Sequence, residues 1–136
     1  MNTTPSRSFA KTGASIIMLT LIAHASAMAA NYTMSTLGCV YRDDKNKVFY
    51  ASNPKRIPYS GDWTDRMNAD FFKEYLIKKY GLPENIHVDY CHHSLDDAPP
   101  ELTASASIKR NIDNVTKNPR NRYQVIMTDF EPKPVD

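Results

Sequence analysis

The chain has 136 residues, with 17 basic and 15 acidic side chains and a formal net charge of +2. Arg7 and Lys11 lie in an N-terminal segment that we expect to be removed, which leaves 15 basic and 15 acidic residues. A formally neutral chain lacks the positive field of a non-specific nucleic-acid binder, so we predict no nucleic-acid partner. The remaining length of about 106 residues suits one small domain, residues 31–136.

Residues 1–30 have the pattern of a secretory signal peptide. Two basic residues precede an apolar run at 14–23, and the stretch ends in small residues, ASAMAA at 25–30. We predict cleavage after Ala29, with Ala27 and Ala30 as alternatives. The apolar run is shorter than the roughly 20 residues that span a bilayer, and no second run follows. We therefore predict a periplasmic or secreted protein that is not inserted in the membrane after cleavage.

Two short β-prone runs, residues 32–42 and 48–52, open the mature chain. The polar link at 43–47 between them predicts a hairpin. Pro54 and Pro58 each lack a backbone donor, so we expect them to end the second strand and residues 57–61 to form a loop.

Residues 62–80 have the periodicity of a helix. Their apolar stripe consists of Met67, Phe71, Phe72, Tyr75 and Leu76. Asp62 or Thr64 is expected to cap the N-terminus. Gly81, followed by Pro83, is expected to end the helix.

The last third of the chain predicts a strand, a helix and a strand. Residues 86–91 form the third strand, with Val88 and Tyr90 on one face and Cys91 with its polar neighbours on the other. The second helix spans 100–117 and buries Ala104, Ile108, Ile112 and Val115. Residues 123–130 form the fourth strand, and 131–136 are a proline-interrupted tail.

The predicted order is thus β-β-α-β-α-β, an α+β domain. We expect one four-stranded sheet with both helices packed on one face. A βαβ crossover would be right-handed, while the strand order stays open.

The chain contains two cysteines, Cys39 and Cys91. An even pair in an exported protein predicts a disulfide. Closing the loop of about 52 residues would stabilise the fold by roughly 4 kcal/mol. The alternatives are two free thiols or one metal-bound thiol.

The pattern resembles a group of small exported proteobacterial two-cysteine proteins of uncharacterised function. The matching features are Cys39, Tyr50-Ala51-Ser52, the helix end YLIKKYG at 75–81, Cys91 and Thr128-Asp129-Phe130. The resemblance implies the fold and export, and it implies no catalytic residue.

A metal site at His87, Asp89, His92 and His93 is one chemical hypothesis, since imidazole and carboxylate bind zinc. In an extended strand His92 points away from the face that His87 and Asp89 share, so one ion requires the chain to turn at Cys91. We favour the alternative that these are polar residues at the end of a strand, and we predict no cofactor.

A catalytic set is not evident in the sequence. Ser52 or Ser94 could pair with His92 or His93, but neither serine lies in a nucleophile motif. A disulfide would also remove the thiols from catalysis. We predict that the protein is not an enzyme.

The loop YSGDW at 59–63 contains the single tryptophan. Trp63 could be a lid over the first helix, which we favour, or it could anchor an interface. By exclusion, we predict a domain that binds another protein, such as an inhibitor or immunity-type protein. The expected contact residues are Tyr59, Asp62, Trp63, His92 and His93. The alternatives are a periplasmic metal-binding protein and a structural accessory of an envelope or secretion assembly.

Overall fold

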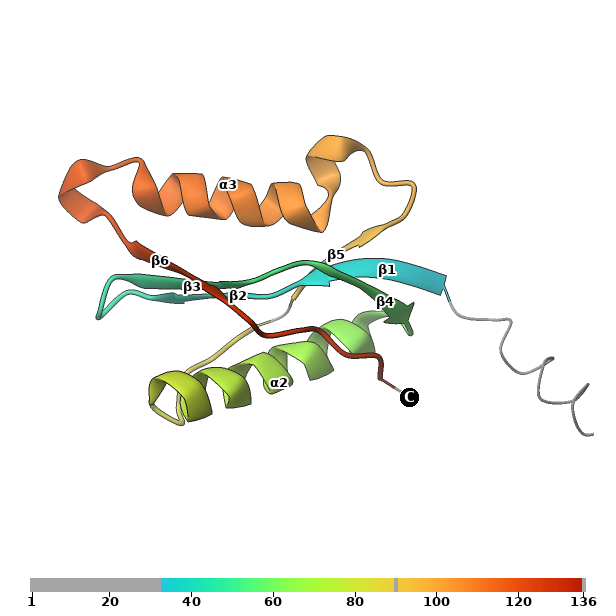
Figure 1. Cartoon of the computed structure of the whole chain (residues 1–136), viewed down its shortest axis with the longest axis horizontal. Coiled ribbons are helices and arrows are strands. Elements are labelled where there is room, and N and C mark those ends of the chain that lie inside the picture. Colours follow the sequence, from blue (N-terminus) through green and yellow to red (C-terminus); the bar gives the residue numbers. More distant parts are fainter. Residues whose placement is uncertain (1–32, 90, 136) are drawn as a thin grey trace, which may run out of the picture. The chain divides into compact units, whose positions relative to one another are not determined.

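The computed structural model describes residues 33–89 and 91–135, so the expected signal peptide lies outside the described residues. The described part combines short strands with two α-helices, which confirms the α+β class (Figure 1). The strands are β1 Thr33–Gly38, β2 Val40–Asp43, β3 Val48–Ser52, β4 Lys55–Tyr59, β5 His92–Leu95 and β6 Gln124–Thr128. The helices are α2 Asp62–Tyr80 and α3 Ala104–Thr116, with 3-10 turns η1 Pro100–Leu102 and η2 Pro119–Asn121.

The strands form two three-stranded sheets, in the orders β4-β1-β5 and β2-β3-β6. Strand β1 is antiparallel to both of its neighbours. Strand β3 is antiparallel to β2 and parallel to β6. The expectation of one four-stranded sheet is therefore wrong in this respect, because the first predicted strand is divided into β1 and β2, and the chain forms an additional strand, β4, after the second.

A bulge at residues 53–54 divides the hairpin. The N–H of Ser52 donates to the carbonyl oxygen of Cys39 at 2.8 Å. The next matched pair is Leu37 and Lys55. One residue separates these pairs on the first arm and two separate them on the second, which is the arrangement of a β-bulge. The extra residue changes which positions face inward: Tyr50 before the bulge and Ile57 after it lie in the same core.

The second predicted strand is confirmed as β3, which ends before Pro54, but strand β4 replaces most of the loop predicted at 57–61. Pro58 lies within β4, where it is paired with Met34 of β1. Since β4 is at the edge of its sheet, a residue without an N–H can occupy it without breaking a central ladder.

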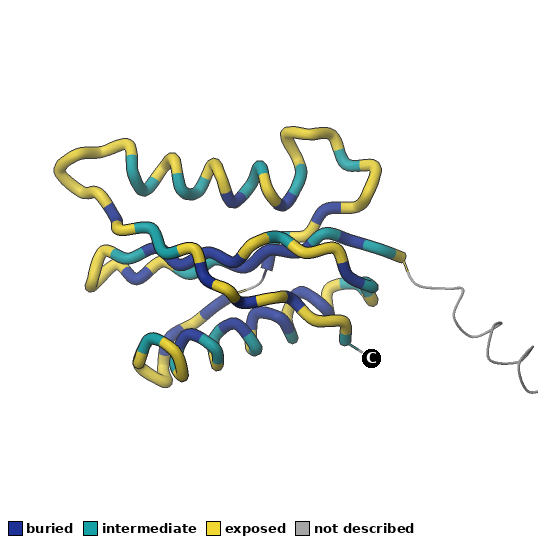
Figure 2. Tube along the Cα trace, viewed as in Figure 1, coloured by how far each residue is buried: buried dark blue, intermediate teal, exposed yellow. Residues whose placement is uncertain are grey.

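Helices α2 and α3 lie on opposite faces of the sheets (Figure 1). The core under α2 includes Leu37, Tyr50, Ile57, Phe72 and Leu76. A second core includes Phe49, Ala51, Ile108 and Tyr123, and thus lies under α3. Figure 2 shows the buried residues gathered in the strands and on the sheet-facing side of each helix.

The expectation that both helices share one face is therefore wrong, for a topological reason. The connection through α2 runs from β4, past β1, to β5. The connection through α3 runs in the opposite direction, from β5 to β6, which pairs with β3 on the arm of the hairpin that leads into β4. Connections of the same hand that cross a sheet in opposite directions place their helices on opposite faces.

Helix α2 has the predicted bounds but a different buried face. Its buried residues are Thr64, Asp65, Asn68, Ala69, Phe72 and Leu76. Of the predicted stripe, Phe72 and Leu76 are buried, whereas Met67, Phe71 and Tyr75 are half-buried. The first residue before the helix is Gly61, with φ 84°, and no side chain caps it, so the expected cap by Asp62 or Thr64 is wrong. Gly81 ends the helix in the left-handed conformation, as predicted.

The third strand lies later in the chain than predicted. Ile86 and Val88 are buried in the α2 core and His87 and Asp89 are exposed, but the paired strand β5 is His92–Leu95. Alternating burial alone did not identify the paired residues, because Ile86 and Val88 are buried by packing, whereas β5 is defined by its register with β1. Cys91 was predicted to share a face with polar residues, but it is fully buried.

The second helix is confirmed with a shorter span. The turn η1 replaces its first residues, and Thr103 accepts a hydrogen bond from the N–H of Ala106 at the true N-terminus. Ala104 and Ile108 are buried as predicted, while Ile112 and Val115 are half-buried. The predicted fourth strand is also confirmed as the shorter β6.

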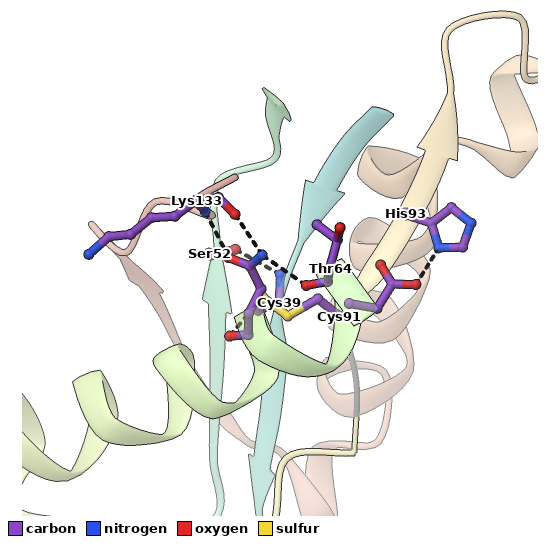
Figure 3. The surroundings of a disulfide bond; sticks show 8 residues. Cys39, Ser52, Thr64, Cys91, His93 and Lys133 are labelled. Carbon is purple, nitrogen blue, oxygen red and sulfur yellow. Dashed lines mark hydrogen bonds and ion pairs between the residues drawn. A yellow bond between two sulfur atoms is a disulfide. The ribbon is translucent and has the colours of Figure 1, made fainter. Parts of the chain in front are cut away.

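A disulfide joins Cys39 to Cys91, as predicted (Figure 3). Both cysteines are fully buried. Cys39 lies between β1 and β2 at the bulge, and Cys91 immediately precedes β5. The disulfide therefore fixes the start of β5 beside the break in the hairpin.

Candidate functional site

A cleft of about 410 Å³ lies between the first turns of α2 and the beginning of β5. It is lined by Asp62, Asp65, Arg66, Cys91, His92 and His93. Three of the five predicted contact residues, Asp62, His92 and His93, therefore lie at one cleft. Tyr59 contacts His93, with ring centroids 4.7 Å apart. Trp63 does not line the cleft, but it follows Asp62 in the first turn of α2.

The order of the strands explains this arrangement. Strands β4 and β5 flank β1, and their register places Tyr59 opposite Thr33 and His93 opposite Leu37. Side chains at these positions lie on the same face of the sheet as Leu37, which is the face that α2 covers. The start of α2 is thereby placed over residues that are 34 positions apart in the sequence.

Tyr59, Asp65 and His93 form a hydrogen-bonded cluster. The hydroxyl of Tyr59 donates to Oδ2 of Asp65 at 2.8 Å. Nδ1 of His93 lies 2.8 Å from the same oxygen and 3.2 Å from the Tyr59 hydroxyl. A carboxylate oxygen at this distance assigns the proton of a neutral imidazole to Nδ1, which leaves Nε2 as an acceptor. Figure 3 shows the His93 ring directed outward from the disulfide.

Asp65 is the buried carboxyl group of this cluster, and its surroundings shift its pKa. Its side chain is 8% exposed, and burial raises its pKa, while the hydrogen bond from Tyr59 and the neighbouring His93 lower it. Oδ1 of Asp65 has no partner among the described residues. Burial and the bond to Asp65 raise the pKa of Tyr59 above its usual value, so Tyr59 stays a neutral donor. Asp65 is thus a buried acceptor that positions two side chains.

His92 lies on the other face of β5. It is matched with Gly38 and is half-buried. Burial lowers its pKa, Arg110 and His93 lower it further, and Asp65 opposes the effect. His92 and His93 therefore have different surroundings although they are adjacent.

The predicted metal ligands do not come together. His87 and Asp89 form their own pair, with Nε2 and Oδ1 2.7 Å apart and both side chains more than three-quarters exposed. His92 and His93 point to opposite faces of β5. Within residues 33–89 and 91–135, no group of three or more His, Cys, Asp or Glu side chains is arranged to hold a metal ion.

The cleft contains imidazoles, carboxylates, a guanidinium and a disulfide. An imidazole held by a carboxylate is an arrangement used by general bases and by metal ligands. The side chains that line the cleft include no hydroxyl and no free thiol. These groups suit the recognition of a polar or charged surface.

Trp63 is 55% exposed, so the favoured interpretation as a lid over the helix is wrong. Its neighbours Thr64 and Asp65 are buried. One turn of α2 thus presents tryptophan outward while it inserts polar side chains inward.

Sequence reasoning missed Asp65 and Arg66. The signal for Asp65 was its spacing: it precedes Ala69, Phe72 and Leu76 by four, seven and eleven residues, so it extends their buried stripe. A charged residue on such a stripe requires partners, which here are on β4 and β5.

Comparison of the chain with protein-family models, curated proteins and solved structures found no match. In the part of the chain that the structure describes, no helix combines the length and the apolar character needed to cross a membrane.

Proposed function

We propose that the mature protein is exported and binds another protein through the α2–β5 surface, which we define as Asp62, Trp63, Arg66 and His93. Export is supported by the leader pattern of residues 1–30 and by the disulfide, which is typical of oxidising compartments. The resemblance to small exported two-cysteine proteins agrees with this proposal.

The exposure of Trp63 carries the proposal. Tryptophan is among the residues that dominate binding energy at protein interfaces. Here more than half of its surface is accessible, at the start of a helix of 19 residues. Burying this side chain against a partner would contribute hydrophobic free energy that folding of this chain leaves unused.

The groups beside Trp63 are held in place before any partner binds. The Tyr59–Asp65–His93 cluster fixes the His93 ring, and the disulfide fixes the start of β5. A surface that is already ordered loses less entropy on association. Arg66 and Asp62 add opposite charges at the edge of the cleft, which favours a partner with complementary charges.

The partner class that we propose is a toxin or hydrolase, which the domain would block as an inhibitor or immunity-type protein. The support is a small disulfide-bonded domain, formally neutral after loss of the leader, with a cleft whose lining lacks a hydroxyl or free-thiol nucleophile. Such a protein acts by covering a surface and needs no chemistry of its own.

Affinity capture with matched baits tests the proposal. The mature oxidised protein, Trp63→Ala and Leu102→Ala are used as baits in an extract of the source, followed by mass spectrometry. Leu102 is the control because it is also an exposed apolar side chain, at 61%, but it lies on η1 and is not part of the α2–β5 surface. A partner retained by the wild type and Leu102→Ala, and bound at least tenfold more weakly by Trp63→Ala, supports the surface. Inhibition of that partner's activity by the purified protein would support the inhibitor role.

The stability of the baits distinguishes binding from unfolding. An exposed Trp63 predicts that Trp63→Ala changes the free energy of unfolding by no more than about 0.5 kcal/mol. Equal capture by Trp63→Ala and the wild type, or loss of the fold in Trp63→Ala, would count against the proposed surface.

A further inference from the structure

The C-terminal residues 131–135 are docked on α2 although they belong to no helix or strand. Pro132 is less than 2% exposed. The side chain of Asn68 contacts the backbone of Lys133 twice: Oδ1 accepts its N–H at 2.7 Å, and Nδ2 donates to its carbonyl oxygen at 2.9 Å (Figure 3). The hydroxyl of Ser60 donates to the carbonyl oxygen of Val135 at 3.2 Å. The tail is therefore held along its backbone.

Asn68 is a buried group adapted to an extended chain. It is fully buried and also donates to the carbonyl oxygen of Thr64 at 2.9 Å. An amide that is buried without partners costs about 1–3 kcal/mol. Because Asn68 presents both a donor and an acceptor to the tail, α2 offers an extended peptide the same pair of bonds that a neighbouring strand would offer.

The contacts identify which features of the tail are recognised. The bonds from Asn68 and Ser60 go to backbone atoms. The side chains of the tail make further contacts. Glu131 pairs with Lys55 at 2.7 Å, where both side chains are partly or largely exposed, and Nζ of Lys133 lies 5.9 Å from the ring centre of Phe71. Pro132 is enclosed, whereas Pro134 is exposed. The residues that contact the tail form a groove that holds an extended backbone and encloses proline at one position.

Two clefts adjoin the start of the tail, and both are lined by Asp129, Phe130 and Glu131. One cleft, of about 450 Å³, is also lined by residues that include Phe71, Tyr75 and Lys133. The other, of about 320 Å³, also includes Asn53 and Pro54. An incoming segment can therefore contact α2 and the hairpin bulge while the tail is still in place.

We propose that this groove is a peptide-binding site for an extended, proline-containing segment of a partner protein. In the free protein residues 131–135 occupy the groove. An extended, proline-containing segment of the partner displaces them and occupies it instead. The groove shares no residue with the α2–β5 surface, so this inference is independent of the proposed function. A tethered tail acts at a high effective concentration, and a short free peptide therefore competes poorly until the tail is weakened.

The full-length oxidised chain with Pro132→Glu tests the site, because a charged side chain is not accommodated where Pro132 is enclosed. The probe is a synthetic peptide with blocked ends and the sequence of residues 131–135, EPKPV. It is titrated into the wild type and the variant and followed by NMR. We expect the peptide to bind the variant at least tenfold more tightly than the wild type and to shift the side-chain amide signals of Asn68.

Matched controls separate recognition from general loosening. Pro134→Glu changes an exposed proline and should behave as the wild type. Adding Asn68→Leu to Pro132→Glu should abolish binding, and so should replacing the proline at the second position of the peptide by glutamate. If Pro132→Glu does not fold, Pro132→Gly, which removes the ring without adding a charge, should show a smaller increase in affinity. A folded variant of either kind that does not bind the peptide at millimolar concentration would overturn the proposal.

Discussion

The carboxylate of Asp65 lies 2.8 Å from Nδ1 of His93 and so joins α2 to β5. These residues are 28 positions apart in the sequence, and the disulfide between Cys39 and Cys91 lies immediately before β5. The pair is therefore a consequence of how the hairpin, the helix and β5 are assembled, and the raised pKa of Asp65 reports on that assembly.

The variant Asp65→Asn should gain stability relative to the wild type as the pH rises. Burial raises the pKa of Asp65 above its unfolded value, so the unfolded chain releases this proton first. The wild type then loses stability as the pH rises through the raised pKa, whereas below the unfolded pKa both states are protonated and the difference no longer varies with pH. Asparagine can still accept the bonds from Tyr59 and His93.

Urea unfolding from pH 3 to pH 7 measures this difference. Tyr59, Asp62 and His93 also face Asp65, and the same comparison in a His93→Gln background isolates the titration of Asp65. A free-energy difference between Asp65→Asn and the wild type that does not vary with pH would contradict the explanation.

Ser52→Ala should lower the free energy of unfolding by about 1–3 kcal/mol. Oγ of Ser52 accepts the backbone N–H of Cys39 at 2.8 Å, and both residues are fully buried. Alanine would leave that N–H without its partner at the bulge. Chemical denaturation of the oxidised protein measures the loss. Ser105→Ala, at an exposed position of α3, is the control and should change stability by less than about 0.5 kcal/mol.

Gly38→Ala should destabilise the protein by about 1–3 kcal/mol. A Cβ atom at Gly38 would overlap Cδ1 of Ile108 on α3. Ile108→Val removes that atom, so the cost of Gly38→Ala should fall in the Ile108→Val background. A double-mutant cycle by urea unfolding measures the coupling. Additive effects of the two substitutions would show that the close approach of α3 to β1 is not the cause.

Replacing both Cys39 and Cys91 by alanine should lower stability by about 4 kcal/mol. The disulfide joins residues 52 positions apart, and its loss increases the conformational freedom of the unfolded chain. Guanidinium denaturation of the double variant beside the oxidised wild type measures the change. An unfolding free energy that stays within 1 kcal/mol of the wild type would contradict this prediction.

The helix α2 shows how much of the fold was accessible from sequence. Its bounds, residues 62–80, follow from a periodic stripe and from Gly81 and Pro83, which act within a few residues of the chain. The hairpin at 43–47 and the end of α3 at residues 118–119 follow from similar local signals. The disulfide could be predicted because only one pairing of two cysteines is possible within a chain.

The sheet could not be derived in the same way. The bulge divides the first predicted strand into β1 and β2, and the chain then forms β4 where no strand was predicted. Pro58 argued against a strand, although an edge position permits it. The placement of α2 and α3 on opposite faces depends on where β5 and β6 pair, and strand order was open from sequence.

The candidate site combines both kinds of information. Tyr59, Asp62 and Trp63 were predicted from residue type and loop position, and His92 and His93 as polar residues at the end of a strand. The exposure of Trp63 and the role of Asp65 required the fold. Local signals in the sequence determined the helices, the hairpin and the cysteine pair, because backbone preference acts between near neighbours. Tertiary structure alone decided which residues meet across β4, β1 and β5, because contacts between distant residues depend on strand order and register.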